Sequence, residues 1–258
     1  MADPGLVANA RVGSSMVLAG AEGRHAATVA RVRRGEVIEV VDGRGTRLRA
    51  TVLDHGRDEV AFEVSQIEVE PEPSPRFAVV QAVPKGEHAD LAVDQLTQAG
   101  ADRIVPWAAS NCVVRWDDER ARKGQGRWQQ EATRAAKQSR RSRIPQVDPL
   151  ARTPAIEAAV READLAIMLH EEATEPLAEV TLPGAGTVLI IVGPEGGLDP
   201  DERAALSAAG AREVRLGAAI LRTSLAGAMA LAVLSAQDRW RSTSGTNAPV
   251  HAMEGWRA

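Results

Sequence analysis

Two glycine-bearing segments in the second half of the chain could bind a ligand. Their sequences are Ile190-Ile-Val-Gly-Pro-Glu-Gly-Gly-Leu198 and Leu216-Gly-Ala-Ala-Ile-Leu-Arg-Thr-Ser224. Each follows an apolar run typical of a buried strand, and each precedes a helix pattern. Glycines let backbone N–H and C=O groups approach a ligand closely, and ligands of an α/β sheet bind beyond the carboxyl ends of its strands. Both segments therefore predict a binding site, although a purely structural turn would show the same glycines.

Side chains of the second segment indicate what kind of ligand could bind. Ile220 and Leu221 are apolar residues in a connection, where they could form the wall of an adenine-sized pocket. Arg222 lies at the start of the next helix, beside Thr223 or Ser224 as the expected N-cap. Its guanidinium could stabilise an anion, or it could simply pair with a neighbouring carboxylate.

A third segment, from Arg115 to Arg143, is rich in positive charge. It holds ten basic and four acidic residues, inside a chain whose net charge is -4. A helix pattern over 126–139 gathers four of the basic residues on one face: Arg127, Arg134, Lys137 and Arg141. Such a face predicts contact with nucleic-acid phosphates, although a solvated surface would show the same spacing. A weaker basic patch lies in the N-terminal region and comprises Arg31, Arg33, Arg34, Arg44, Arg47 and Arg49.

The balance between arginine and lysine also bears on the ligand. Only three of the 31 basic residues are lysines. Arginine binds phosphate bidentately and stacks on bases, which suits nucleic acid, whereas a GC-rich coding bias would produce the same excess. Because the chain has no tyrosine and only two phenylalanines, base stacking would depend on arginine planes or on Trp107, Trp116 and Trp128.

Several other classes of protein are disfavoured. There is no P-loop, no G-x-G-x-x-G after a strand and no G-x-S-x-G elbow. A single cysteine, Cys112, excludes an internal disulfide framework, and with only five histidines we expect no metal. No apolar run approaches the ~18 residues of a membrane span, and the N-terminus lacks a secretory signal. We therefore expect a cytoplasmic protein with no membrane partner.

The elements that must position these residues fall into two groups. The N-terminal region predicts a small β-barrel with three strands, over Glu36–Val41, Arg47–Leu53 and Glu59–Val69. A helix is expected over His25–Arg34, ended by Gly35. The proline-rich stretch 70–75 predicts a stiff linker at a domain boundary.

Strands and helices alternate after this linker, which predicts an α/β domain with a parallel sheet. The expected strands are Phe77–Val83, Arg103–Trp107, Leu165–Leu169, Val188–Val192 and Glu213–Leu216. Helices are expected over Glu87–Ala99, from Asp199 to Gly210 and over Thr223–Trp240. In the second of these helices, Asp199 is the expected N-cap and Glu202 should complete a capping box.

The last of these helices is apolar almost all round. Small residues at Ala226, Gly227, Ala228 and Ala230 permit close packing. This composition suits a subunit interface, and burial in the core of one subunit would also explain it.

In order along the chain, these motifs resemble a known family. Val192-Gly-Pro-Glu-Gly-Gly197, followed by Leu216-Gly217 and Ile220-Leu-Arg-Thr223, resembles the RsmE-type 16S rRNA (uracil-N3)-methyltransferases of the SPOUT superfamily. Further residues that fit the same family are Arg127-Trp128, Gln138-Ser-Arg-Arg141, Ile144-Pro145, Pro106, His25 and Arg31. The resemblance spans nearly the whole chain.

The resemblance implies a fold and an activity. It implies an N-terminal PUA-like β-barrel over 1–72 that binds RNA, and a C-terminal SPOUT α/β domain over 76–258 with a parallel sheet and a trefoil knot. The implied enzyme is a homodimer that uses S-adenosyl-L-methionine to methylate N3 of a uridine in the 16S rRNA of the small ribosomal subunit. Two alternatives stay open: a SPOUT methyltransferase for another RNA, and a non-catalytic RNA-binding protein of ribosome assembly.

The resemblance also implies site residues. The cofactor-binding positions are Leu169, His170, Glu171, Gly193, Glu195, Gly196, Leu216, Gly217, Ile220, Leu221 and Arg222. Arg222 and Glu195 are the candidate catalytic residues. The candidate RNA-binding residues are Arg31, Arg33, Arg34, Arg127, Arg134, Lys137, Gln138 and Arg141.

The chain departs from the family pattern directly after Arg222-Thr223. The family has Glu-Thr-Ala there, whereas this chain has Ser224-Leu225-Ala226, so we assign no carboxylate base at this position. Uracil N3 carries a proton at neutral pH. The implied reaction therefore needs a group that removes this proton, or a cation that stabilises the developing anion.

Overall fold

The computed structural model describes residues 1–114 and 116–241, and these form two compact units. One unit comprises Met1–Pro73 together with Gln129–Gln146, and the other comprises Ser74–Trp128 and the chain from Val147 onward. The first break between the units lies between Pro73 and Ser74, and the segment 129–146 clusters with the N-terminal unit. Arg115 of the basic segment and the last part of the expected second domain lie outside the described residues.

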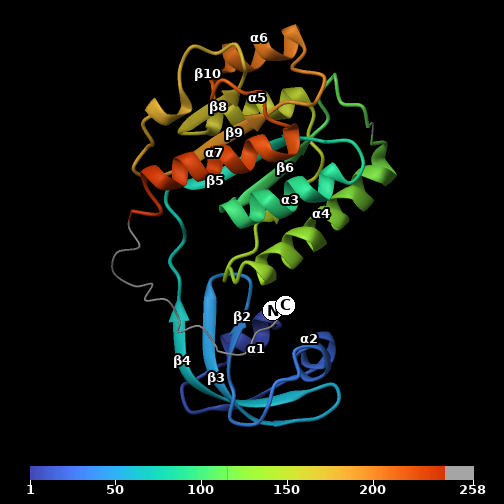
Figure 1. Cartoon of the computed structure of the whole chain (residues 1–258), viewed down its shortest axis with the longest axis vertical. Helices are drawn as coiled ribbons and strands as arrows, with labels where there is room; N and C mark the ends of the chain where they lie inside the picture. The colour runs from blue at the N-terminus through green and yellow to red at the C-terminus, as the bar shows by residue number, and fades with distance from the viewer. Residues whose placement is uncertain (115, 242–258) are drawn as a thin grey trace. The chain divides into compact units, whose positions relative to one another are not determined.

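The first unit is built on a four-stranded antiparallel sheet (Figure 1). Its strands are β1 (Ser15–Leu18), β2 (Val37–Val41), β3 (Thr46–His55) and β4 (Val60–Val69), in the order β1-β4-β3-β2. The helices α1 (Pro4–Ala8) and α2 (Gly20–Arg24) complete the unit, and a π-helical turn (His25–Val29) continues α2. The inward face of the sheet carries fully buried residues such as Leu48, Phe62 and Val64, which form the core of this unit.

The expected helix over His25–Arg34 has the wrong bounds. The helical residues run from Gly20 to Val29, and Arg31 has a positive φ of 53°. The chain leaves the helix at this point, and the next residue, Val32, is buried with Val52 and Val60. The basic residues Arg31, Arg33 and Arg34 are exposed on either side of Val32.

The second unit is organised around a six-stranded sheet in the order β10-β8-β9-β5-β6-β7 (Figure 1). Its strands are β5 (Arg76–Ala82), β6 (Arg103–Trp107), β7 (Gln146–Val147), β8 (Leu165–Leu169), β9 (Thr187–Val192) and β10 (Arg212–Val214). The pairs β10–β8, β8–β9, β9–β5 and β5–β6 are all parallel, as predicted. The strand expected over Glu213–Leu216 lies earlier, so Leu216 falls in the loop that follows β10.

Helices cover both faces of this sheet. They are α3 (His88–Ala99), α5 (Thr153–Glu162), α6 (Pro200–Ala209) and α7 (Thr223–Gln237), and a 3-10 turn lies at Leu177–Glu179. The remaining helix, α4 (Asp118–Gln138), has its first part in this unit and its last part in the first unit. Side chains alternate along β5. Ala78 and Val80 belong to the core that contains Ile156 of α5, whereas Val79 faces Gly227 of α7. This two-residue period sorts the strand's side chains between the two helix layers.

The small residues of α7 pack within the unit. A Cβ on Gly227 would lie only 2.7 Å from Leu96 Cδ2 of α3 and 3.2 Å from Val192 Cγ2 of β9. Ala228 and Ala230 are also buried. Two large apolar residues of α7, Leu225 and Met229, remain exposed.

Two helix starts differ from expectation. α4 begins at Asp118 instead of Gly126, and the Asp117 carboxylate accepts a hydrogen bond from Arg120 N at its first turn (2.8 Å). The N-cap of α7 is Arg222, with no side-chain capping bond, so neither Thr223 nor Ser224 caps this helix. Both of these residues are instead buried in the first turn.

The capping box expected at α6 is only half formed. Asp199 caps the helix, since its Oδ1 accepts from Asp201 N (3.0 Å). The Glu202 carboxylate does not complete the box, because it accepts hydrogen bonds from Ser110 N (3.0 Å) and Thr153 Oγ1 (2.6 Å). This buried carboxylate therefore ties the loop after β6 and the start of α5 to α6.

Candidate functional site

A cavity of about 620 Å³ opens in the second unit where the loops after β8, β9 and β10 meet. These three strands are adjacent and parallel, so their carboxyl ends lie at one edge of the sheet. The cavity is lined by every residue that the sequence assigned to the cofactor: Leu169, His170, Glu171, Gly193, Glu195, Gly196, Leu216, Gly217, Ile220, Leu221 and Arg222.

The glycine loop after β9 is both a tight turn and part of the cavity wall. Gly197 has a φ of 79° and donates its N–H to Pro194 O (3.0 Å), which closes the turn. A Cβ on Gly193 would lie 3.0 Å from Leu198 Cγ, and one on Gly196 would lie 3.3 Å from Asn111 Cβ. The two interpretations of this loop are therefore compatible, because the structural turn exposes its backbone to the cavity.

Glu195 connects this loop to a fourth strand. Its Oε1 accepts a hydrogen bond from Lys85 N (3.2 Å), in the connection between β5 and α3. This connection also brings His88, the first residue of α3, into the cavity wall. His88 is not among the site residues predicted from the sequence. Its position after a buried strand parallel to β9 was the signal that could have found it.

The loop after β10 presents a positive charge next to apolar side chains. Ile220 is 83% exposed and lines the cavity beside Leu221. The guanidinium of Arg222 is exposed and has no hydrogen-bond or ion-pair partner among residues 1–114 and 116–241. The alternative role considered for Arg222, an ion pair with a neighbouring carboxylate, is therefore not found among the described residues.

A buried side chain of β5 holds the first turn of α7 against the sheet. Gln81 of β5 is fully buried, and its side-chain amide donates to Ala82 O (3.0 Å) and to Thr223 O (3.4 Å). The first turn of α7 contributes Thr223, Ser224 and Ala226 to the cavity. The helix N-terminus thus faces the cavity, where its unpaired N–H groups favour negative charge.

Polar contacts also hold the loop after β8. His170 donates its backbone N–H to Val214 O (3.0 Å), and Glu172 donates its own to His170 Nδ1 (3.2 Å). Arg203 of α6 then binds both Glu172 (3.3 Å) and Glu213 (2.7 Å). Hydrogen bonds from Arg203 hold the pKa of Glu213 below its usual value of 4.5, and the same carboxylate raises the pKa of Arg203.

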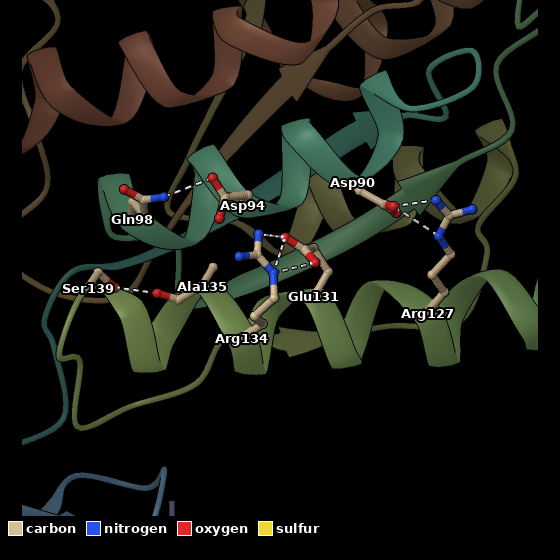
Figure 2. A network of polar contacts seen from close by, with 8 residues as sticks. All are labelled: Asp90, Asp94, Gln98, Arg127, Glu131, Arg134, Ala135 and Ser139. Carbon is tan, nitrogen blue, oxygen red and sulfur yellow. Dashed lines mark hydrogen bonds and ion pairs between the residues drawn. The ribbon is translucent and has the colours of Figure 1, made fainter. Parts of the chain in front are cut away.

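The basic face predicted on α4 is largely engaged by carboxylates. Figure 2 shows Arg127 bound to Asp90 of α3 (Nε–Oδ2 3.0 Å) and Arg134 bound to Glu131 (Nε–Oε2 2.9 Å). Lys137 pairs with Glu22 in the first unit. Gln138 is exposed and Arg141 is partly buried. The prediction is wrong for Arg141, because α4 ends at Gln138 and the chain leaves the helix through Arg140, which has a φ of 56°. The other three basic residues do share the helix, and each is paired with a carboxylate.

Comparison with known proteins identifies the family. The family model described as the RNA methyltransferase domain matches residues 70–235, and the one described as the RNA methyltransferase PUA domain matches residues 18–65. The chain belongs to the RNA methyltransferase family. It is 44% identical over 237 residues to the ribosomal RNA small subunit methyltransferase E of Mycobacterium bovis, which covers 90% of both chains.

Two solved structures resemble the chain along most of its length. One is a ribosomal RNA small subunit methyltransferase E from Neisseria gonorrhoeae bound to S-adenosyl methionine. It is 26% identical with a TM-score of 0.77, and the match covers 89% of this chain and 94% of that one. The other is a methyltransferase from Legionella pneumophila in complex with the same cofactor, with 26% identity, a TM-score of 0.76 and the same coverage.

Among residues 1–114 and 116–241, no helix is long and apolar enough to cross a membrane. The same part of the chain holds no cluster of three or more His, Cys, Asp or Glu side chains suited to a metal ion.

The pairing of Arg203 with Glu213 predicts a pH dependence of stability. Folding lowers the pKa of Glu213, so the ionised carboxylate stabilises the folded protein. This contribution to the free energy of unfolding is complete above about pH 4.5 and is lost as the pH falls through the pKa of the folded state. Glu213→Gln should therefore lower the free energy of unfolding at pH 7, and its difference from wild type should shrink below pH 4.5. Urea unfolding at a series of pH values measures this difference. The control is Glu157→Gln, which breaks the more exposed pair with Arg161 and should change stability little at any pH. A difference for Glu213→Gln that is constant with pH would contradict the prediction.

Proposed function

We propose that the protein transfers the methyl group of S-adenosyl-L-methionine to N3 of a uridine in the 16S rRNA of the small ribosomal subunit. The observation that carries the proposal is the cavity that gathers all of the implied cofactor residues at the carboxyl ends of β8, β9 and β10. The similar structures that hold S-adenosyl methionine support the choice of cofactor. Such a substrate would place the enzyme in the cytoplasm.

The residues present fit this cofactor. The loops after β9 and β10 offer glycine backbone for hydrogen bonds, and Ile220 and Leu221 offer apolar surface for an adenine ring. A Cβ on Gly217 would meet nothing within 4 Å, so the space beside it is open. The family implies that the loops around this cavity form a trefoil knot, and we include the knot in the proposal.

When bound, the cofactor would supply an electrophilic methyl group on its sulfonium. The remaining tasks fall to residues of this chain. Arg222 lies at the helix N-terminus that faces the cavity, and its unpaired guanidinium is placed to stabilise the anion that forms as N3 loses its proton. Glu195 is fixed by Lys85 N, which suits a residue that orients the loop and the cofactor. Ser224 lines the cavity, but a neutral serine hydroxyl is too weak a base to take the N3 proton, so we assign it no such role.

RNA binding in this proposal involves both basic regions. Arg31, Arg33 and Arg34 are exposed in the PUA-like unit, and they are candidate phosphate ligands. On α4, Arg127, Arg134 and Lys137 would have to exchange a carboxylate for a phosphate. We therefore expect each of these three to contribute less than an unpaired arginine does.

The proposed homodimer would use the exposed side of α7. Leu225 and Met229 are 36% and 44% exposed and lie four residues apart, so they share one face of the helix. Large apolar side chains that face water on a buried helix are typical of an interface.

The decisive experiment is methylation of purified small ribosomal subunits with labelled S-adenosyl-L-methionine, followed by identification of the modified nucleoside. Arg222→Ala should reduce the single-turnover rate by roughly 10²–10³-fold, while RNA affinity stays near wild type. Arg215→Ala is a matched control, because Arg215 is exposed and lines the same cavity. An unmodified subunit with wild-type enzyme would refute the proposed function, and an unchanged rate in Arg222→Ala would remove that residue from the chemistry.

A second prediction tests the cofactor site without any RNA. Gly217→Val should place its side chain in the open space of the cavity and weaken S-adenosyl-L-methionine binding at least about tenfold. The new side chain would occupy space that the ligand needs, whereas it would clash with no neighbouring residue. Titration calorimetry measures this affinity. Gly184→Val is the control, because its Cβ also meets nothing and it lies outside the cavity. Equal affinity in the two variants would place the cofactor elsewhere. No binding to wild type would favour a non-catalytic RNA-binding protein.

A third prediction concerns the dimer. Met229→Glu should place a charge in the proposed interface and shift the protein toward monomer in sedimentation velocity. Val12→Glu changes an exposed valine of the first unit in the same way and should leave the oligomeric state unchanged. A wild-type protein that is monomeric and active would contradict the dimer.

A further inference from the structure

A second, smaller cavity of about 260 Å³ lies in the unit that holds the cofactor site, and it shares no lining residue with that site. It is formed by Trp116 and the first turns of α4, together with the connection that leads to α5. Its charged side chains are Arg122, Arg152 and Asp118, and its apolar wall includes Pro149 and Leu150.

The two arginines of this cavity lack the ion-pair partners that neighbouring basic residues of α4 have. Along the same helix, Arg120 pairs with Asp117, Lys123 pairs with Glu119 and Arg127 pairs with Asp90. In contrast, Arg122 and Arg152 are exposed, and neither has an ion pair or side-chain hydrogen bond with any described residue. Two unneutralised guanidinium groups at one cavity are suited to bind an anion.

Trp116 gives the cavity a fixed aromatic wall. Its ring meets Trp128 edge-on, with centroids 5.7 Å apart and an interplanar angle of 72°. Trp128 is only 1% exposed, so it provides a rigid support. A Cβ on Gly124 would lie 2.4 Å from the Trp116 ring, so only glycine lets the ring rest on α4. Of the three tryptophans considered for stacking, Trp107 and Trp128 are buried, which leaves Trp116.

We propose that this cavity binds one nucleotide of single-stranded RNA, with the base stacked on Trp116 and the phosphate held by Arg122 and Arg152. An aromatic face beside cationic groups is how proteins bind unpaired nucleotides without reading their sequence. Arg152 immediately precedes α5, whose N-terminus adds a favourable field for a phosphate. The carboxylate of Asp118 repels phosphate, but it can accept a hydrogen bond from a ribose 2′-hydroxyl. The inference rests on the proposed function, because it assigns a further contact to the same RNA substrate.

The test measures binding of a short single-stranded oligouridylate and of an RNA duplex over a range of salt concentrations. Trp116→Ala should weaken single-strand binding by roughly 5- to 100-fold and leave duplex binding nearly unchanged. The double variant Arg122→Ala/Arg152→Ala should reduce the slope of log K against log salt by about 0.7, since both arginines are proposed to neutralise the same phosphate. Lys123→Ala is the matched control, since it removes a charge that Glu119 already pairs, and it should change the slope much less.

Cofactor affinity and thermal unfolding of each variant separate a binding defect from a folding defect. Because Arg122 and Arg152 are exposed, the double variant tests the proposal even if Trp116→Ala fails to fold. Wild-type affinity and salt slope in the double variant would overturn the proposal. Undiminished oligonucleotide binding together with weaker binding to the intact subunit would also overturn it, in favour of a contact with a ribosomal protein. The two proposals can also fail separately. If the variants lose oligonucleotide binding but the wild-type enzyme methylates no subunit, the nucleotide site is supported and the proposed reaction is refuted.

Discussion

The site depends on one constraint, the parallel pairing of four adjacent strands. β10, β8, β9 and β5 all run the same way, so the loops that leave their carboxyl ends must converge at one edge of the sheet. Their buried apolar runs fix this register, because a slip by one residue would exchange the side chains that face the two helix layers. The cavity residues are therefore distant in sequence and close in space because the sheet places them there. The chemistry is carried by the loops, and the apolar strands supply only position.

The packing of α7 shows how the sheet and the loops are joined. Gly227 lets the helix approach α3 and β9 closely, while Gln81 holds its first turn against β5. At the other end, Arg239 donates to Gly100 O (2.8 Å) and Pro75 O (2.7 Å), and its guanidinium lies 3.9 Å from the centroid of the Phe77 ring. Removing a largely buried cation of this kind leaves its partners unsatisfied, which costs more than an exposed ion pair contributes. Both ends of the helix are thus held in place. Because Arg222 is the N-cap of this helix, these contacts also fix its position.

Much of the fold follows from the sequence where the signal is local. Continuous apolar runs such as Leu165–Leu169 identified the buried strands, and the rule that ligands bind beyond strand ends identified the cavity loops. Errors arose where a distant contact overrode a local pattern. Glu202 bonds to Ser110 and Thr153 instead of completing its capping box, and neither partner is near it in sequence.

The basic face of α4 shows the same limit in electrostatics. Its helical spacing was correct for Arg127, Arg134 and Lys137 but not for Arg141, which lies beyond the end of the helix. The carboxylates that neutralise this face come partly from other elements, Asp90 from α3 and Glu22 from α2. The glycines at 124 and 126 hid the start of this helix. The reason for the first of them is the ring of Trp116, which no periodicity could reveal.

The division of α4 between the two units has a consequence for how the chain can be cut. The backbone passes from one unit to the other three times, after Pro73, after Trp128 and after Gln146. A fragment that ends at Pro73 would lose partners from 129–146, including Ser142 O, which accepts from Gly45 N (3.1 Å), and Ile144 N, which donates to Gly43 O (2.9 Å). The PUA-like unit is therefore not an independent module appended to a catalytic one. It is completed by a segment encoded inside the methyltransferase sequence, so neither half can be transplanted to another protein by a single junction.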